Sequence, residues 1–168
     1  MDAKAEALLN RLYLDDDRQR REGLPASERT RNLTRVSGEY LSIFARAMNA
    51  RRVVEIGSSN GVSTIWFALA MCATGGFVTG TEIIPERAAT ANANLAEAGL
   101  SAFGTVLSGD AQQSLAAIES GIDIAFIDAE KDDYADHFEV VWPNLRIGGV
   151  VIADNVTSHD ISFYQAML

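Results

Sequence analysis

From Arg52 onward, short runs rich in β-branched and aromatic residues alternate with longer stretches of helical periodicity. The runs that we expect to form strands span residues 53–56, 77–82, 105–108, 122–128 and 150–154. Regular alternation of strand and helix is typical of a parallel sheet with helices on both faces. Pro85 can open the helix after the second run, and Gly99 follows its end. The sequence therefore predicts an α/β fold with a doubly wound, mainly parallel sheet.

The first fifty residues differ from this pattern. They show helical periodicity at 5–14 and 33–48, separated by a stretch at 23–27 that contains Gly and Pro. We expect two helices beside the sheet, which either cover its functional edge or serve as a structural cap. With 168 residues and 48% apolar content, the chain predicts a single domain, with N-terminal helices in 1–50 and the sheet and its helices in 51–168.

The charge of the chain disfavours nucleic acid as a partner. Lys and Arg total 14 against 23 Asp and Glu, so the net charge is −9, which repels phosphate backbones. An arginine cluster at 18–21 adjoins the acidic residues 15–17, and we interpret both as a solvated, mixed-charge helix face.

The single cysteine, Cys72, lies in an apolar run, so we expect a buried thiol and no intrachain disulfide. This cysteine usage fits the cytoplasm. The N-terminus lacks the apolar stretch of a signal peptide, and no run approaches the roughly 20 apolar residues of a membrane span. We expect a cytoplasmic protein without membrane association.

The motif VVEIGSSNG predicts a binding loop between the first strand and the next helix. Gly57 and Gly61 allow a tight turn and close approach of a ligand, and the helix starting near Val62 offers free N–H groups. Ser59 stands where dinucleotide-binding motifs carry a second glycine, which disfavours a nicotinamide-dependent oxidoreductase. An ordinary glycine turn is the structural alternative.

An acidic residue stands at or directly after the end of each of the remaining strands. Glu82 ends the second strand, where a carboxylate can bind ribose hydroxyls. Asp110 follows the third, as a contact to an adenine amino group or backbone amide, or as a helix N-cap. FIDAEKDDY places Asp128 at the end of the fourth strand with Lys131 nearby, and VVIADN ends the fifth.

The carboxyl ends of neighbouring parallel strands border one crevice, so Asp128 and the pair Asp154-Asn155 are expected to converge there. Two acids and an amide suit a hard divalent cation, and Lys131 would supply a base beside it. A helix cap, a surface amine and a turn are the structural alternatives for these residues. Their joint occurrence with a glycine loop favours a functional site.

Between about residues 37 and 155, the motifs EIGSSNGVS, TEIIPERAATANANLAEAG, SGDA, FIDAEKDDY and ADN resemble the cation-dependent class I S-adenosylmethionine O-methyltransferases of the catechol and caffeoyl-CoA type. The resemblance implies a Rossmann-like fold, Mg²⁺ or another divalent cation on Asp128, Asp154 and Asn155, and Lys131 as general base. It also implies a set of residues that contact S-adenosylmethionine: Glu55, Gly57, Ser58, Ser59, Ser63, Glu82, Ile83, Asp110, Ala111 and Asp128. Ser37, Gly38 and Tyr40 correspond to positions where relatives touch this cofactor.

The resemblance further implies a function. We expect divalent-metal-assisted methylation of a hydroxyl on a small catechol-like or other aromatic acceptor, by a homodimer. A metal-independent small-molecule methyltransferase and a non-catalytic S-adenosylmethionine-binding domain are the alternatives. Tyr134 is expected to brace the loop after Asp128, and His137 and Trp142 are expected to pack or hydrogen-bond. His159 follows ADN by four residues, near the mouth of the site, but the family pattern requires no histidine there and we assign it no role.

The sheet of this family normally continues with a C-terminal strand hairpin, which the chain, ending at Leu168, is expected to lack. The strand at 150–154 would then lie at an edge of the sheet. Soluble proteins usually cover such an edge. We expect either further natural sequence or a partner subunit to cover it.

Overall fold

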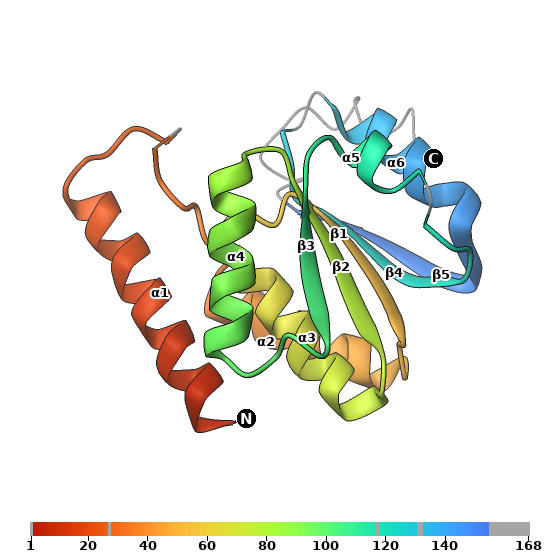
Figure 1. The fold of residues 1–168 in the computed structure, drawn as a ribbon, viewed down its shortest axis with the longest axis horizontal. Helices are drawn as coiled ribbons and strands as arrows, with labels where there is room; N and C mark the ends of the chain where they lie inside the picture. The colour runs from red at the N-terminus through yellow and green to blue at the C-terminus, as the bar shows by residue number, and fades with distance from the viewer. Residues whose placement is uncertain (1, 27, 117, 131–132, 155–168) are drawn as a thin grey trace.

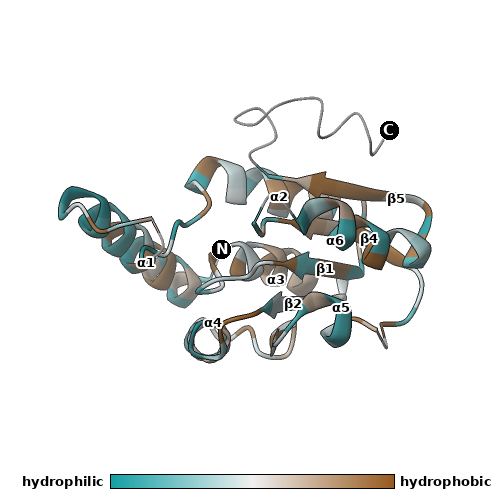
Figure 2. Ribbon diagram, turned by 90° about the horizontal axis from the view of Figure 1, so that it is seen from above, coloured by the Kyte–Doolittle hydropathy of each residue, from teal (hydrophilic) through white to brown (hydrophobic). Residues whose placement is uncertain are grey.

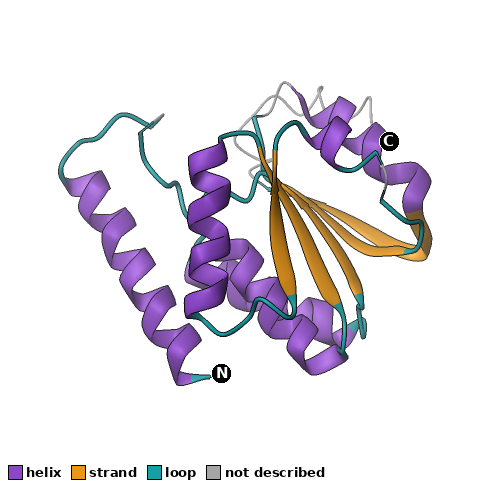
Figure 3. Cartoon of the chain, viewed as in Figure 1, coloured by secondary structure: helices purple, strands orange, loops and turns teal. Residues whose placement is uncertain are grey.

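The computed structural model describes residues 2–26, 28–116, 118–130 and 133–154. Its centre is a parallel sheet with the strand order β3-β2-β1-β4-β5 (Figures 1 and 3). The strands are β1 (Arg52–Ile56), β2 (Phe77–Glu82), β3 (Gly104–Ser108), β4 (Ile122–Ile127) and β5 (Leu145–Ala153). The chain adds strands outward from β1 in one direction and then returns to add β4 and β5 on its other side. This reversal beside β1 is where open α/β sheets bind ligands.

Helices cover both faces of the sheet, as predicted. The structure contains α1 (Ala3–Arg21), α2 (Arg35–Ala47), α3 (Val62–Thr74), α4 (Pro85–Glu97), α5 (Ala111–Ser114), α6 (Tyr134–Val141) and a 3₁₀ turn, η2 (Trp142–Asn144). Helices α2, α3 and α4 lie on one side of the sheet, and α5 and α6 lie on the other (Figure 1). Helix α1 packs outside this arrangement, against α4 and α3.

Two apolar clusters hold these layers together. The larger lies between the sheet and α3 and includes Phe67, whose ring meets that of Phe126 at 5.7 Å between centroids. The smaller lies on the opposite face and includes Ile127 and Tyr134. Strand β4 is buried along its whole length because both clusters cover it. Figure 2 shows the resulting contrast between the apolar strands β4 and β5 and the mainly hydrophilic helix α1.

Helix α1 continues beyond its apolar periodicity at 5–14 to Arg21, through the mixed-charge helix face, where ion pairs from Arg18 to Asp15 and from Arg20 to Asp16 support its polar last turns. One strand is longer than the sequence predicts. Strand β5 begins at Leu145, before the glycine pair, and not at residue 150. Gly148 adopts a φ of 78°, which accommodates the register shift between β4 and β5.

The sequence interpretation was wrong for Cys72, which is exposed. Most of α3 is buried, including Met71, but Cys72 belongs to the last turns of the helix, where the side facing away from the sheet meets solvent. An apolar sequence run cannot distinguish these sides. Within the described residues β5 forms an edge of the sheet, and the chain from residue 155 onward lies outside the described part. None of the helices in the ranges given above has the length and apolar character that a membrane span needs.

Candidate active site

The glycine loop, residues 57–61 between β1 and α3, begins at the carboxyl edge of the sheet. The N–H groups of Gly57 and Ser58 both donate to the carbonyl oxygen of Thr81, each at 3.0 Å, which ties the loop to β2. On the other side, the N–H of Asp128 donates to the carbonyl of Ile56 at 2.9 Å. The loop is therefore fixed between the ends of two neighbouring strands.

Similar backbone hydrogen bonds fix the residues that follow the outer strands β3 and β5. The N–H of Gly109 donates to the carbonyl of Glu82 at 2.9 Å, and the N–H of Asp154 donates to the carbonyl of Ile127 at 3.0 Å. All five strand ends thus deliver their following residues to one edge of the sheet. This is the crevice that the sequence predicts.

A cavity of about 940 Å³ opens at this edge. Most of the predicted site residues that the structure describes line it: Gly57, Ser59, Glu82, Ile83, Asp110, Ala111, Asp128 and Asp154. A much smaller cavity of about 10 Å³ shares several of these residues, and Ser58 and Ser63 line it as well. Lys131, Asn155 and His159 lie outside the described residues.

The backbone of the loop requires glycine at Gly57. Its φ is 93°, and a Cβ built there would lie 2.2 Å from the carbonyl oxygen of Asp128. Ser59 also has a positive φ, 49°, in the left-handed region that a glycine adopts more easily. The loop therefore keeps a glycine-like conformation at the position where the sequence carries serine.

Glu82 is fixed by the loop that it faces. Its side chain is 7% exposed and accepts hydrogen bonds from the N–H groups of Ser59 at 2.8 Å and Ile84 at 2.9 Å, one on each oxygen. A carboxylate oxygen can accept more than one hydrogen bond. Glu82 therefore lines the cavity as a preoriented acceptor for ligand hydroxyl groups.

Asp110 forms the helix N-cap that was one of its two interpretations. Its Oδ1 accepts a hydrogen bond from the N–H of Gln113 at 3.2 Å and so caps α5. The contact to an adenine amino group stays a prediction, since Asp110 also lines the cavity. Ile83, which is 69% exposed, presents an apolar surface on the same cavity wall.

Glu55 lies behind the glycine loop and not on the wall of either cavity. It is fully buried and accepts hydrogen bonds from the hydroxyls of Ser58, at 2.8 Å, and Thr64. Burial raises the pKa of Glu55 above its ordinary value, although neighbouring hydroxyl groups oppose this. Its contact with the cofactor stays a prediction, and the structure gives it the role of joining the loop to α3.

Replacing Glu55 by glutamine tests this burial. A carboxyl group whose pKa is raised on folding stabilises the protein below its unfolded pKa of about 4.3, and that stabilisation is lost as pH rises through the folded pKa. The wild-type free energy of unfolding should therefore fall relative to Glu55→Gln as pH rises above this value. The fall should be about 1.4 kcal/mol for each tenfold difference in proton affinity between the folded and unfolded chains. Urea unfolding of both proteins at a series of pH values measures the difference, and parallel curves would refute the expectation.

Asp128 and Asp154 are the described residues of the predicted metal site. Both line the large cavity from adjacent strands. Tyr134 is fully buried, and its hydroxyl donates to the backbone carbonyl of Asp154 at 3.2 Å, so it braces the end of β5. No group of three or more His, Cys, Asp or Glu side chains suited to a metal occurs in the described part of the chain. Two carboxylates with hard oxygen atoms nevertheless fit a divalent cation that completes its shell with an amide, water and substrate.

The N-terminal segment contributes cavity residues that the sequence did not suggest. Arg20 of α1 and Ser37 of α2 line the cavity, and the chain that connects these helices lines it with Thr30, Arg31, Asn32 and Thr34. The hydroxyl of Ser59 donates to the carbonyl of Thr30 at 3.0 Å. These residues lack periodicity or a recognisable motif, so only the folded chain reveals them.

The remaining candidates divide between cavity and packing. Ser37 lines the cavity, whereas Gly38 lies so close to Trp66 that a Cβ would be 2.2 Å from its ring. Tyr40 is 59% exposed and does not line the cavity. His137 lines it, and burial lowers the pKa of this imidazole despite nearby carboxylates. Trp142 stacks on Phe138 at 5.2 Å between ring centroids, in agreement with a packing role.

A parallel α/β sheet with a glycine loop after β1, a buried acid after β2 and a cavity at the strand reversal defines a nucleotide-cofactor-binding protein. A profile described as "Methyltransferase domain" matches residues 54–156. Catechol O-methyltransferase of Mycobacterium tuberculosis is 34% identical over 157 residues, covering 90% of this chain and 70% of the relative. Catechol O-methyltransferase of Niastella koreensis is 34% identical, covering 80% of this chain and 60% of the relative.

Solved structures agree with these matches. An O-methyltransferase from Bacillus cereus in complex with S-adenosylhomocysteine superposes with a TM-score of 0.77 at 30% identity, covering 94% of this chain and 68% of the other. TomG, an O-methyltransferase from Streptomyces achromogenes solved with S-adenosylmethionine, gives 0.75 at 29% identity, with the same two coverages of 94% and 68%. The chain belongs to the S-adenosylmethionine-dependent O-methyltransferase family. Family membership also removes the nicotinamide-dependent alternative.

Proposed function

We propose that this protein transfers the methyl group of S-adenosylmethionine to a hydroxyl of a small catechol-like or other aromatic acceptor, with the assistance of a divalent cation. The observation that carries the proposal is that one cavity is lined by both Glu82 and the carboxylates Asp128 and Asp154. In this one cavity, Glu82 can accept a hydrogen bond from a cofactor hydroxyl, and Asp128 and Asp154 can bind a cation. The names of the two catechol O-methyltransferase relatives support the acceptor class.

The side of the cavity lined by Glu82 and Ile83 offers a contact to each part of S-adenosylmethionine. The N-terminus of α3, where Val62 and Ser63 line the smaller cavity, offers backbone N–H groups to the methionine carboxylate. Glu82 accepts from the ribose hydroxyls, and Ile83 gives the adenine ring an apolar surface. These contacts fix the position of the sulfonium methyl group, and alignment is the main requirement of a displacement on a donor that is already activated.

The acidic half would hold the cation. Asp128, Asp154 and Asn155 would provide its protein ligands, and the cation would supply the Lewis acidity that lowers the pKa of an acceptor hydroxyl. Lys131, as the neutral amine, would take the proton from that hydroxyl as general base. Tyr134 holds the backbone of Asp154 in place for this role.

The decisive experiment measures transfer of a labelled methyl group from S-adenosylmethionine to a panel of catechols, before and after chelation. We expect EDTA to abolish transfer and added Mg²⁺ to restore it. Transfer that survives chelation would favour the metal-independent methyltransferase. Calorimetric binding of S-adenosylhomocysteine without transfer to any acceptor, and without binding of the cation, would favour the non-catalytic binding domain. The homodimer and the cytoplasmic location stay predictions, and sedimentation velocity tests the first.

A further inference from the structure

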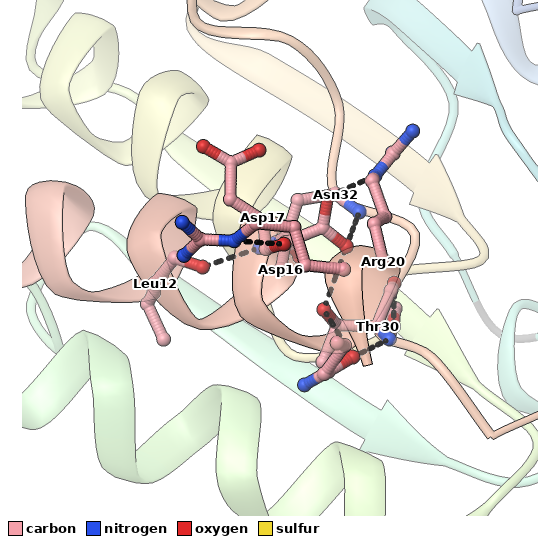
Figure 4. Close-up of polar contacts among 9 residues, drawn as sticks. Leu12, Asp16, Asp17, Arg20, Thr30 and Asn32 are labelled. Carbon is pink, nitrogen blue, oxygen red and sulfur yellow. Dashed lines mark hydrogen bonds and ion pairs between the residues drawn. The ribbon is translucent and has the colours of Figure 1, made fainter. Parts of the chain in front are cut away.

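Asp16 on α1 is a buried carboxylate within a polar helix face. The charge pattern predicts a solvated surface at residues 15–17, and this interpretation is wrong for Asp16, which is only 5% exposed. Figure 4 shows its side chain turned toward Thr30, Asn32 and Arg20. A carboxylate is rarely buried without partners, so its contacts indicate why it lies there.

The partners of Asp16 come from the segment that connects α1 to α2. Its Oδ1 accepts hydrogen bonds from the hydroxyl of Thr30 at 3.1 Å and from the backbone N–H of Asn32 at 3.4 Å. Its Oδ2 accepts from Nε of Arg20 at 2.8 Å, which neutralises the charge. One carboxylate thus joins the helix to both a side chain and the backbone of the connecting segment (Figure 4).

Two further hydrogen bonds hold the same segment against α1. The N–H of Thr30 donates to Oε1 of Gln19 at 2.9 Å, and Nδ2 of Asn32 donates to the carbonyl of Leu12 at 3.0 Å. The segment is therefore attached to successive turns of the helix. These contacts fix the backbone of residues 30–32 beside the glycine loop, where the hydroxyl of Ser59 reaches the carbonyl of Thr30.

The opposite side of this segment faces the cofactor cavity. Thr30 and Asn32 line both cavities. The carbonyl of Thr30 accepts from the hydroxyl of Ser59, whose N–H donates in turn to Glu82. A continuous series of hydrogen bonds therefore runs from Asp16 through Thr30 and Ser59 to the carboxylate proposed to bind ribose.

We infer that Asp16 is a positioning residue for S-adenosylmethionine: it holds residues 30–32 against the glycine loop and so sets the affinity for the cofactor from a place outside the cavity. The inference rests on the proposed function, because it assigns the cavity to this cofactor. It adds that helix α1, which packs outside the layers that cover the sheet, belongs to the binding machinery. A role confined to stability is the competing explanation.

The two explanations differ in what the variant Asp16→Asn does. Asparagine has nearly the same shape, but it loses the charge that attracts Arg20 and turns one acceptor into a donor. We expect calorimetry to give about a tenfold weaker affinity for S-adenosylhomocysteine. In turnover, KM for S-adenosylmethionine should rise by a similar factor, with kcat at saturating cofactor and KM for the acceptor within about twofold.

Matched variants separate positioning from stability. Asp17→Asn makes the same charge change at the exposed neighbouring residue and should leave the affinity unchanged. Ile122→Val removes one methylene from the buried core at the amino end of β4, away from the cavity, and should lower stability without changing affinity. Thr30→Val removes the hydroxyl that donates to Asp16 and should weaken binding as Asp16→Asn does, whereas Thr30→Ser should restore it.

The outcomes also separate this inference from the proposed function. If Asp16→Asn binds S-adenosylhomocysteine as wild type does, or loses no more affinity than Ile122→Val, the inference is overturned and the proposed function stands. If wild type binds S-adenosylhomocysteine but transfers no methyl group, the proposed function fails, and the comparison of affinities still supports or overturns the role of Asp16. If wild type does not bind it, both fail.

Discussion

Replacing Asp154 by asparagine should lower kcat/KM for methyl transfer at least 100-fold, which corresponds to about 3 kcal/mol of transition-state stabilisation. The variant keeps the size of the side chain but loses the anionic oxygen that a hard cation prefers. The backbone contact from Tyr134 to the carbonyl of Asp154 is retained, so the end of β5 should stay in place. The expected loss therefore reports on the carboxylate itself.

The measurement combines turnover with binding. Titration with Mg²⁺ should activate the variant only at much higher concentration than wild type, while calorimetry with S-adenosylhomocysteine should give an affinity within about threefold of wild type. Asp136→Asn is the matched control, because it removes a carboxylate from an exposed position on α6 that does not line the cavity. A variant Asp154→Asn that retains normal turnover and normal Mg²⁺ dependence would refute the assignment of Asp154 as a ligand.

The second large effect is expected for Gly57→Ala. The new Cβ would lie 2.2 Å from the carbonyl oxygen and 2.7 Å from the carbonyl carbon of Asp128, and both atoms belong to backbone that β1 holds in place. The φ of 93° adds strain for any residue with a Cβ. We expect a loss of about 3 kcal/mol or more in stability, since strain and overpacking each cost about 1–3 kcal/mol. Affinity for S-adenosylhomocysteine should fall at least 100-fold, about 3 kcal/mol.

Gly99→Ala provides the control for Gly57→Ala. Gly99 follows α4 with a φ of 73°, but a Cβ there meets nothing within 4 Å. Its substitution should cost about 1 kcal/mol from backbone strain alone and leave binding unchanged. Chemical denaturation measures the stability of the two variants, and calorimetry measures their affinity for S-adenosylhomocysteine. The difference between them separates the effect of the contact with Asp128 from the effect of the positive φ alone. Equal behaviour of the two alanine variants would mean that the contact between the glycine loop and Asp128 is not restrictive.

Much of the fold could be predicted because its information is local. Each strand contains a short run of apolar or β-branched residues, and Pro85 and Gly99 mark the two ends of α4. The predicted start of β5 was wrong because Gly148 and Gly149 usually interrupt a strand, whereas here Gly148 adopts a positive φ that lets the ladder resume after a register shift. Such an accommodation depends on the neighbouring strand and leaves no mark in the local sequence.

The candidate site could be predicted to a similar extent. Parallel strands place their following residues at one edge, so Gly57, Glu82, Asp128 and Asp154 could be assigned to one crevice from their positions alone, and all four line the cavity. The contribution of residues 30–32 could not, because it results from the docking of α1 and the burial of Asp16. Equally, neither the exposure of Cys72 nor the hidden position of Glu55 follows from residue type.

The sequence by itself determined the class of fold, the residues that follow each strand and the family. All three depend on residue types at short spacing along the chain. Only the tertiary structure decided which polar side chains are buried and which segments meet across the cavity. Burial and contact depend on the packing of elements far apart in sequence, as when Asp16, Thr30, Ser59 and Glu82 form one series of hydrogen bonds. The glycine loop was visible in the sequence, and the N-terminal segment that covers it became visible only in the folded protein.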